Sequence, residues 1–398
     1  MFRAAALGFL LVSVAFAPAA AQVPRDDPSA LAAMRFGPLA LTPTLALRDV
    51  GLDTNVLGQP ESDPEFTMAF VPGADAWLRL GRLRFGSKTE LEWLYFQETA
   101  NQRAFSVTET ATMSLPLSYV APYVTGVYEN TKRRQNAEID FRLRQKTTAW
   151  AAGVTMYPGP RTDVDLQYRR SELRFDDELP GEVFFAPGLD RDNAAVQAEA
   201  RYAVTPLTSA VARIIVERDR FVRSPIRDAD SWTVLPGFDF RPSALISGTA
   251  FVGYRKFDSL APGRPDFAGL VASVDLKYVA RDMTKVEARA ARNVEYSFEP
   301  AEPFYVQTDW HLTLTQAVSY EWDVRAQAGR VSLDFERFEG AALSGRVDRI
   351  WVYGVGMGRR FGIELRVGID VLFTRRESEL AGRSYEGYKV GGSVTYGY

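Results

Sequence analysis

The feature that most constrains the fold of this sequence is an alternation of apolar and polar residues with a period of two. It recurs along most of the chain in segments of roughly ten to sixteen residues. In residues 363–373 apolar side chains occupy the odd positions and mainly polar ones the even positions, and residues 267–278 repeat the pattern in the other phase. In a helix the apolar residues would recur every three or four positions. The pattern therefore predicts β-strands with one apolar and one polar face.

The connections between these strands alternate in length. About eight are short, among them 80–81, 120–122, 158–160 and 359–362, and about nine are longer or more polar. Seventeen connections join about 18 strands, with 16–18 plausible, and an even number places both termini on one side. Short turns at one end and long loops at the other are typical of a bacterial outer-membrane barrel. We therefore predict an all-β fold, a closed antiparallel transmembrane β-barrel with its termini on the periplasmic side. A soluble propeller is the alternative, but the sequence lacks its four-strand repeat.

The composition fits such a barrel and excludes several other classes. A mean hydropathy of -0.16 would suggest a soluble protein, but half-apolar strands also give a modest value. The chain has no Cys and a single His, which excludes disulfide frameworks, thiolate zinc sites and histidine clusters. Its 47 basic and 50 acidic residues nearly balance, so we expect no nucleic-acid partner.

The N-terminus has the form of a secretory signal peptide. Arg3 precedes an apolar run that ends at small residues, with Ala19 and Ala21 in a small-x-small arrangement. A short membrane anchor is the alternative, but the run is shorter than the roughly 20 residues that a spanning helix needs. We predict a signal peptide over 1–21, a short N-terminal periplasmic segment over 22–38 and an outer-membrane barrel over 39–398.

The last strand ends on an aromatic residue and is apolar on one face. The residues on this face that we assign to an assembly signal are Tyr388, Val390, Val394, Tyr396 and Tyr398. Such a strand resembles the signal recognised by the barrel assembly machinery, which we accordingly expect as a partner. An ordinary C-terminal edge strand is the alternative.

The polar faces of the strands carry acids and bases of mixed sign. Burying them in a dry core would be costly, whereas a water-filled interior avoids that cost. We therefore predict a hydrophilic lumen for small solutes, with cross-strand ion pairs and without strong selectivity for either sign. A salt-bridge lattice that only stiffens the wall is the alternative. The lumen-lining candidates are Arg84, Lys88, Glu90, Glu92, Asp165, Arg169, Arg213, Glu217, Asp275, Lys277, Glu287, Arg289, Asp309, His311, Asp323, Arg325, Glu364, Arg366 and Asp370.

Aromatic residues on the apolar faces are expected to form belts at the two membrane interfaces. The residues that we assign to these belts are Trp93, Tyr95, Tyr168, Tyr254, Tyr278, Tyr296, Phe298, Trp351 and Tyr353.

We find no marked site for catalysis, a metal or a cofactor. Asp309 and His311 share a strand face, but no nucleophile accompanies them. Asp53 and Asn55 lack the Gly and distal Glu of a calcium loop. We therefore predict a protein that is not an enzyme. In the long loop at 176–193, the apolar residues 183–188 could fold into the pore, contact a partner or pack over the rim.

Short motifs at both ends of the barrel resemble the putative beta-barrel porin family. They are Pro43-Thr44-Leu45 with Gly51-Leu52-Asp53-Thr54-Asn55-Val56, and Ser393-Val394-Thr395-Tyr396-Gly397-Tyr398. The resemblance implies an outer-membrane channel surrounded by lipid and lipopolysaccharide. Some members of the family are linked to exopolysaccharide production, so polysaccharide export is a second hypothesis and a non-transporting structural barrel a third.

Overall fold

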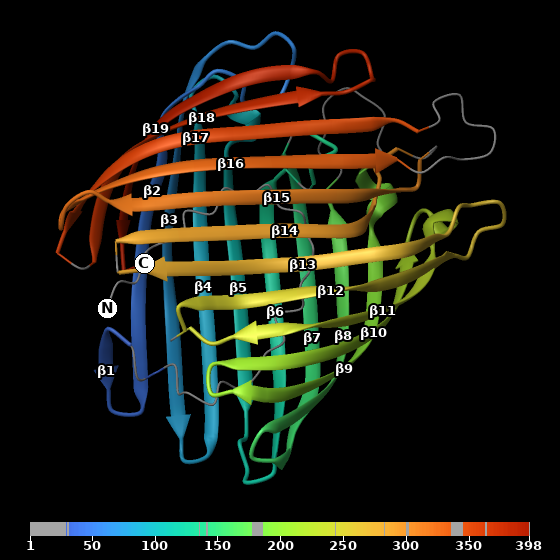
Figure 1. Cartoon of the computed structure of the whole chain (residues 1–398). Helices are drawn as coiled ribbons and strands as arrows, with labels where there is room; N and C mark the ends of the chain where they lie inside the picture. Colours follow the sequence, from blue (N-terminus) through green and yellow to red (C-terminus); the bar gives the residue numbers. More distant parts are fainter. Residues whose placement is uncertain are drawn as a thin grey trace.

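In the computed structural model the alternating segments form long antiparallel strands (Figure 1). The structure describes residues 29, 32–134, 136–140, 142–176, 186–242, 244–281, 283–299, 302–335, 345–362 and 364–397. The predicted signal peptide therefore lies outside the described residues. The strands are β1 Met34–Phe36, β2 Leu39–Asp53, β3 Glu65–Leu80, β4 Leu83–Phe96, β5 Ala104–Ser114, β6 Val120–Arg133, β7 Leu143–Gly159, β8 Thr162–Phe175, β9 Arg191–Thr205, β10 Thr208–Phe221, β11 Ala229–Phe240, β12 Ile246–Ser259, β13 Phe267–Ala280, β14 Thr284–Tyr296, β15 Phe304–Ala317, β16 Trp322–Phe335, β17 Val347–Phe361, β18 Leu365–Glu377 and β19 Tyr385–Tyr396.

Each strand from β2 to β19 pairs antiparallel with the next, and β19 returns to pair with β2. The wall is thus a closed 18-strand barrel, as the sequence predicts. The wall strands have 11 to 17 residues, enough for a tilted strand to cross a bilayer. No helix among the described residues is long and apolar enough to span a membrane, and the helical elements are short 3-10 turns at Ala100–Gln102, Ala186–Leu189 and Pro225–Arg227.

Short turns gather at one end of the barrel and long loops at the other (Figure 1). Three predicted turn positions lie largely within strands. Residues 158–159 belong to β7, which ends at Gly159. Residues 120–122 belong to β6, and the turn before it covers 115–119. The amides of Leu115 and Leu117 donate to the carbonyls of Pro122 and Val120, so Pro122 pairs as an acceptor and needs no N–H. Residues 359–361 likewise belong to β17, and the turn follows them.

The barrel closes at the seam between β19 and β2. Tyr396 pairs with Leu45 and Lys389 with Asp53, which brings both ends of the wall to the end with the short turns. The register shifts at this seam, where Asp49 has a φ of 58° and its carboxylate lies 2.9 Å from Lys389 Nζ. The short strand β1 pairs with the start of β2.

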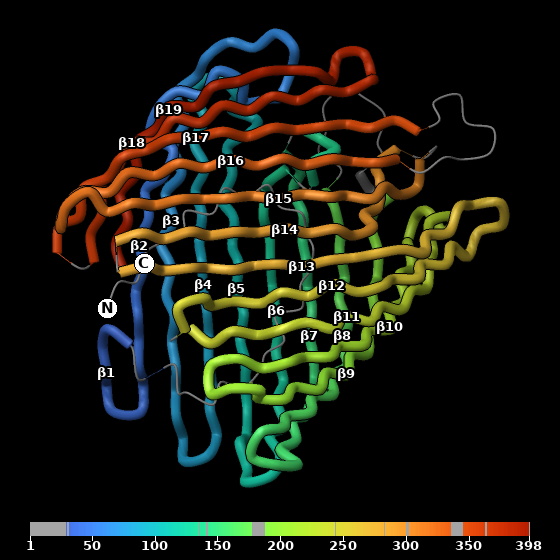
Figure 2. The backbone as a smooth tube through the Cα atoms, viewed as in Figure 1, coloured from blue at the N-terminus to red at the C-terminus, as the bar shows by residue number. Residues whose placement is uncertain are grey.

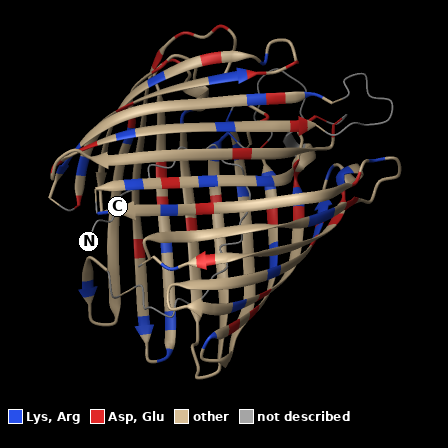
Figure 3. Ribbon diagram, viewed as in Figure 1, with Lys and Arg blue, Asp and Glu red and all other residues tan. Residues whose placement is uncertain are grey.

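Strand parity separates the outer from the inner face. Exposed aromatic and aliphatic side chains such as Trp93, Tyr353 and Ile369 line the outer face, whereas the residues between them are largely buried. Acidic and basic residues are interspersed along neighbouring strands (Figure 3).

Candidate functional site

The regular strand pairing of the wall is interrupted between β13 and β14, near the end of the barrel with the long loops. Their pairing ends at Ala272 and Arg292, although β14 continues to Tyr296 and stays paired with β15 up to Phe304. The β12–β13 hairpin extends past the β14–β15 turn in the view of Figure 2. The end of the β14–β15 hairpin, the described residues of 293–307, therefore separates from β13, while its β15 side stays paired with β16 from Tyr305 onward.

This hairpin end lies inside the barrel, because both of its faces are buried against inner-face residues. On one face Tyr296 packs against Phe221 and Phe257 and donates a hydrogen bond to Asp219 Oδ2 at 2.9 Å. On the other face Tyr305 is fully buried in a cluster formed by β16, β17 and β18. Alternating strands of a barrel wall bury only one face in protein. The segment is thus an inward wedge between two parts of the wall.

The loop between β6 and β7, residues 134–142, meets this wedge from the opposite side of the barrel. Its Ala137 joins the cluster around Tyr305, and its Ile139 joins a second cluster with Phe175 and Phe298. Glu138 Oε1 accepts a hydrogen bond from Ser297 Oγ at 2.8 Å, and Oε2 accepts one from the Phe298 amide at 2.9 Å. We call the described residues of 134–142 and of 293–307 together the interior bridge.

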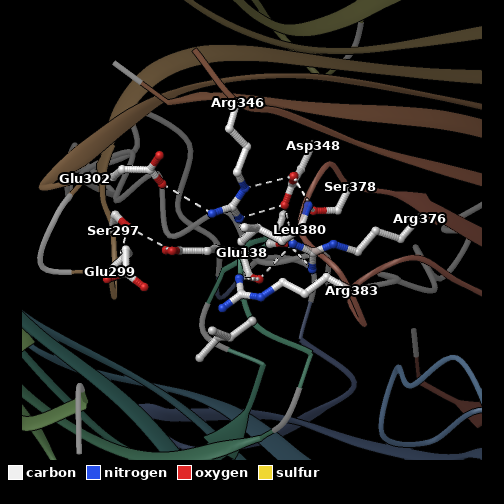
Figure 4. Close-up of polar contacts among 12 residues, drawn as sticks. Glu138, Ser297, Glu299, Glu302, Arg346, Asp348, Arg376, Ser378, Leu380 and Arg383 are labelled. Carbon is white, nitrogen blue, oxygen red and sulfur yellow. Dashed lines mark hydrogen bonds and ion pairs between the residues drawn. The ribbon is translucent and has the colours of Figure 1, made fainter. Parts of the chain in front are cut away.

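Arg376 of β18 holds the loop half of the interior bridge. Its guanidinium donates to the carbonyls of Ala137 and Glu138 at 3.1 and 2.9 Å and to Asp140 Oδ2 at 2.7 Å. It also donates to Asp348 Oδ2 at 2.7 Å, and both side chains are completely buried. Asp348 of β17 therefore holds the Arg376 guanidinium within the wall, and the contacts of Arg376 to the loop link the two from within the protein (Figure 4).

Asp348 connects this anchor to a second arginine. Arg346 donates to both of its carboxylate oxygens at 3.0 and 2.8 Å and reaches Glu302 at 3.2 Å, while Ser378 Oγ donates at 2.6 Å. Figure 4 shows these side chains converging from β17, β18 and the two halves of the interior bridge. Because each buried carboxylate accepts several donors, the network offsets its desolvation cost.

The loop carboxyls of the bridge are nevertheless costly to ionise. Burial raises the pKa of Glu138 despite its hydrogen bonds from Phe298 and Ser297. Burial also raises the pKa of Asp140 and of Glu302, although Arg376 and Arg346 respectively oppose the shift.

Two cavities flank the bridge inside the barrel. The larger, about 280 Å³, is lined by bridge residues including Arg134 and Arg142 and by Glu90, Glu92 and His311 of the wall. The smaller, about 110 Å³, lies where β13 and β14 part and is lined by Arg169, Arg213, Glu217 and Arg255, among others. The interior is thus divided rather than a single open space.

Several predicted lumen residues lie in ion pairs or hydrogen bonds on the inner face. Glu217 of β10 bridges Arg169 of β8 and Arg255 of β12 at 3.2 and 3.4 Å. The remaining contacts join Arg213 to Glu199, Arg289 to Asp275, Arg366 to Asp323, Glu92 to Arg48, Glu287 to Lys285, Asp165 to Thr155 and Asp309 to Gln307.

The other candidates fall on the same face by register. Lys88 faces Asp75, Arg84 faces Arg79, Glu90 faces Gly73, Lys277 faces Glu287, His311 faces Gly329, and Arg325 and Asp370 both face Gly356. Glu364 is the exception. It lies exposed in the turn before β18, because the strand begins two residues later than the alternation suggested, and its carboxylate accepts a hydrogen bond from the outward Tyr396 hydroxyl.

Of the predicted assembly residues, Tyr388, Val390, Val394 and Tyr396 share the outer face of β19, and Tyr398 lies outside the described residues. Their role as a signal stays a prediction. Among the predicted belt aromatics, Tyr296 and Phe298 are misplaced, since they pack inside the interior bridge.

The residues of the interior bridge were not predicted from the sequence. The 176–193 loop was the segment expected to fold into the pore, contact a partner or pack over the rim. Residues 177–185 lie outside the described part, while Leu189 packs in the cluster with Ile139. One signal was available, because Phe304-Tyr305-Val306 interrupts the strict alternation and is buried on both faces.

Comparison with known proteins agrees with this architecture. A family model described as "Putative beta-barrel porin 2" matches residues 124–398. The structure is similar to Pseudomonas aeruginosa OccK2 (OpdF), with a TM-score of 0.50 and 10% identity over 89% of this chain and 97% of that one. The same protein in complex with glucuronate matches with a TM-score of 0.50 and 10% identity, over 89% and 98% of the two chains. No curated protein matches the sequence.

Proposed function

The chain belongs to the putative beta-barrel porin 2 family of the bacterial outer membrane, and we propose that it is a channel for small hydrophilic solutes in which the interior bridge forms the constriction. Family and fold are those of channels rather than enzymes. The observation that carries the proposal is a closed 18-strand wall with ionisable side chains on its inner face, crossed by a bridge with a cavity on either side.

The inner face supports passage of polar rather than apolar solutes. Around the larger cavity, Arg48, Arg133 and Lys389 lie among Asp53, Glu90 and other acids, so neither sign dominates. Pairs such as Arg48–Glu92 are about a quarter exposed, which leaves them open to exchange with a passing solute. We therefore propose weak charge selectivity.

The size of the passage depends on the interior bridge. Residues 136–140 extend from β6 to contacts on β17 and β18 inside the barrel and so narrow the path along the barrel axis. When loops form the constriction of a channel, its conductance depends on how firmly those loops are kept in place.

Planar-bilayer recording tests the proposal. The purified protein should show stepwise conductance with small anions and cations alike, and replacement of residues 136–140 by a short Gly-Ser linker should enlarge each step. A glucuronate salt is a useful probe, because that ligand occupies a barrel of the same fold. A correctly folded barrel that conducts in neither form would establish the structural-barrel alternative instead.

Polysaccharide export is less well supported, since a polymer would need a continuous path past the interior bridge. A deletion strain that retains normal surface polysaccharide and accumulates none inside the cell would count against export. Such a strain would leave the solute-channel proposal intact.

A further inference from the structure

The outer face of β6, β7 and β8 carries basic residues near the end of the barrel with the long loops. They are Lys132, Arg144, Lys146, Arg170 and Arg174. Their parity is that of Tyr128, Trp150, Leu166 and Tyr168, which are 38% to 46% exposed on the outer surface. We call these five residues the outer cation cluster.

The strand register places like charges directly opposite each other in this cluster. Lys132 pairs with Arg144 across β6 and β7, and Lys146 pairs with Arg174 across β7 and β8. Like charges at directly opposite positions destabilise a sheet. Anions close to these pairs therefore offset the repulsion.

Acidic neighbours neutralise only part of the cluster. Asp192 lies 2.6 Å from Arg174 and 3.7 Å from Arg170, Glu172 lies 3.8 Å from Arg174, and Asp176 lies 3.9 Å from Arg144. Five bases against these three acids leave a net charge of +2. Lys146 is exposed, and its ammonium lies 5.9 Å from the centre of the Tyr128 ring.

The opposite ends of the same strands lack such charges. There the outer-face residues are Val120, Pro122, Val154, Met156, Val164 and Leu166. An aromatic pair, Trp150 and Tyr168, whose ring centres are 5.4 Å apart, lies next to the cluster. Arg170 pairs with Trp150, and the other four cations lie beyond it toward the loop end. Aromatic rings mark the level at which lipid chains give way to headgroups.

We infer that the outer cation cluster binds the phosphate groups of the phosphorylated glycolipid in the outer leaflet, lipopolysaccharide. Its acyl chains would lie along Trp150, Leu166 and Tyr168, and its phosphates would meet Lys146 and Arg144 above them. Only a lipid presents phosphate at this height against the outer wall, which is why a free phosphate ion is the less suitable ligand. The inference rests on the outer-membrane location and is independent of solute transport.

Native mass spectrometry of the full barrel with lipid A tests it. The wild type should retain diphosphoryl lipid A at least ten-fold more tightly than Lys146→Glu and Arg144→Gln/Lys146→Gln variants. Monophosphoryl lipid A should bind more weakly, and inorganic phosphate should not compete. Arg359→Gln is the matched control, because Arg359 is an outward arginine at the short-turn end that pairs with Glu321 at 2.7 Å.

Folding of each variant is checked by its heat-modifiable mobility on gels. If the double variant fails to fold, the single Lys146→Glu variant decides. Equal retention by wild type and Lys146→Glu, or equal binding of phosphorylated and dephosphorylated lipid A, would overturn the inference. Competition by inorganic phosphate would also overturn it, by showing an ion site in place of a lipid site.

Discussion

Replacement of Arg376 by Met should release the loop half of the interior bridge and enlarge the channel. Arg376 reaches three positions of that loop, the carbonyls of Ala137 and Glu138 and the carboxylate of Asp140. Tyr385 of β19 also donates to Asp140 at 2.8 Å, and Arg383 donates to the Glu138 carbonyl at 3.4 Å. Met keeps a long unbranched side chain, so the change removes the donors with little change in volume.

The expected free-energy cost depends on which buried polar groups the substitution leaves without a hydrogen-bond partner. Removing one partner of a buried ion pair costs about 3–5 kcal/mol. The lower part of that range applies, because Asp348 retains Arg346 and Ser378 as donors. The loop acceptors can bond water only when the loop leaves its site, so most of the cost falls on the closed state. Because each 1.4 kcal/mol changes an equilibrium constant tenfold, a cost of about 3–4 kcal/mol raises the ratio of open to closed channels roughly 10²- to 10³-fold.

Two measurements on the same preparation report this shift. Single-channel recording should show larger and longer conducting steps in Arg376→Met. Hydrogen exchange followed by mass spectrometry should show faster exchange in a peptide covering 136–140, with β2–β5 unchanged. Arg375→Met is the matched control, since the adjacent Arg375 points outward and pairs with Glu377 and Glu386 at the surface. Unchanged conductance and unchanged exchange in a folded Arg376→Met barrel would refute the reasoning.

Three further predictions concern other parts of the molecule. Burial raises the pKa of Glu138, so the contribution of its carboxyl to closure is fully present below its pKa in the unfolded chain, about 4.3, and is lost as the pH rises through its raised pKa in the folded protein. Open dwell times should therefore lengthen from pH 4 to pH 8, and Glu138→Gln should flatten that trend. Gly51→Ala would drive a Cβ into the Val390 carbonyl at the β2–β19 seam, so the variant should lose heat-modifiable mobility, whereas Gly126→Ala, which meets open space, should keep it. Glu109 is an outward carboxylate midway along β5 that accepts hydrogen bonds from the Ser87 and Thr89 hydroxyls. Glu109→Leu should raise the free energy of unfolding of the barrel in lipid by about 1–2 kcal/mol, as measured by urea titration. No such gain is expected if this surface faces water.

The wall of the barrel was predictable because its signal is local. In β13, the residues of 267–278 show by the alternation of polarity which face is outward, although the inward Phe267 and Val271 are apolar. A one-residue error would move a whole set of side chains to the other face. Where the polarity is ambiguous the prediction failed by a few residues, as at Pro122, which reads as a turn residue but pairs as an acceptor, and at Glu364, which continues the alternation into a turn.

The interior bridge was not predictable in the same way. Tyr296 has the parity of a membrane-facing aromatic residue, and only the separation of β14 from β13 turns it toward Asp219. Glu138 and Asp140 look like ordinary loop acids until Arg376, 236 residues away from Asp140, is brought beside them. Periodicity carries no information about such partners.

By itself, the sequence determined the number and direction of the strands, the closed wall and the face that meets lipid, because alternation and turn length act between neighbours in the chain. Only the tertiary structure decided how the interior is divided. Closing the barrel places β6, β14 and β18 around one space, and the buried contacts among Glu138, Ser297 and Arg376 then fix the interior bridge across it.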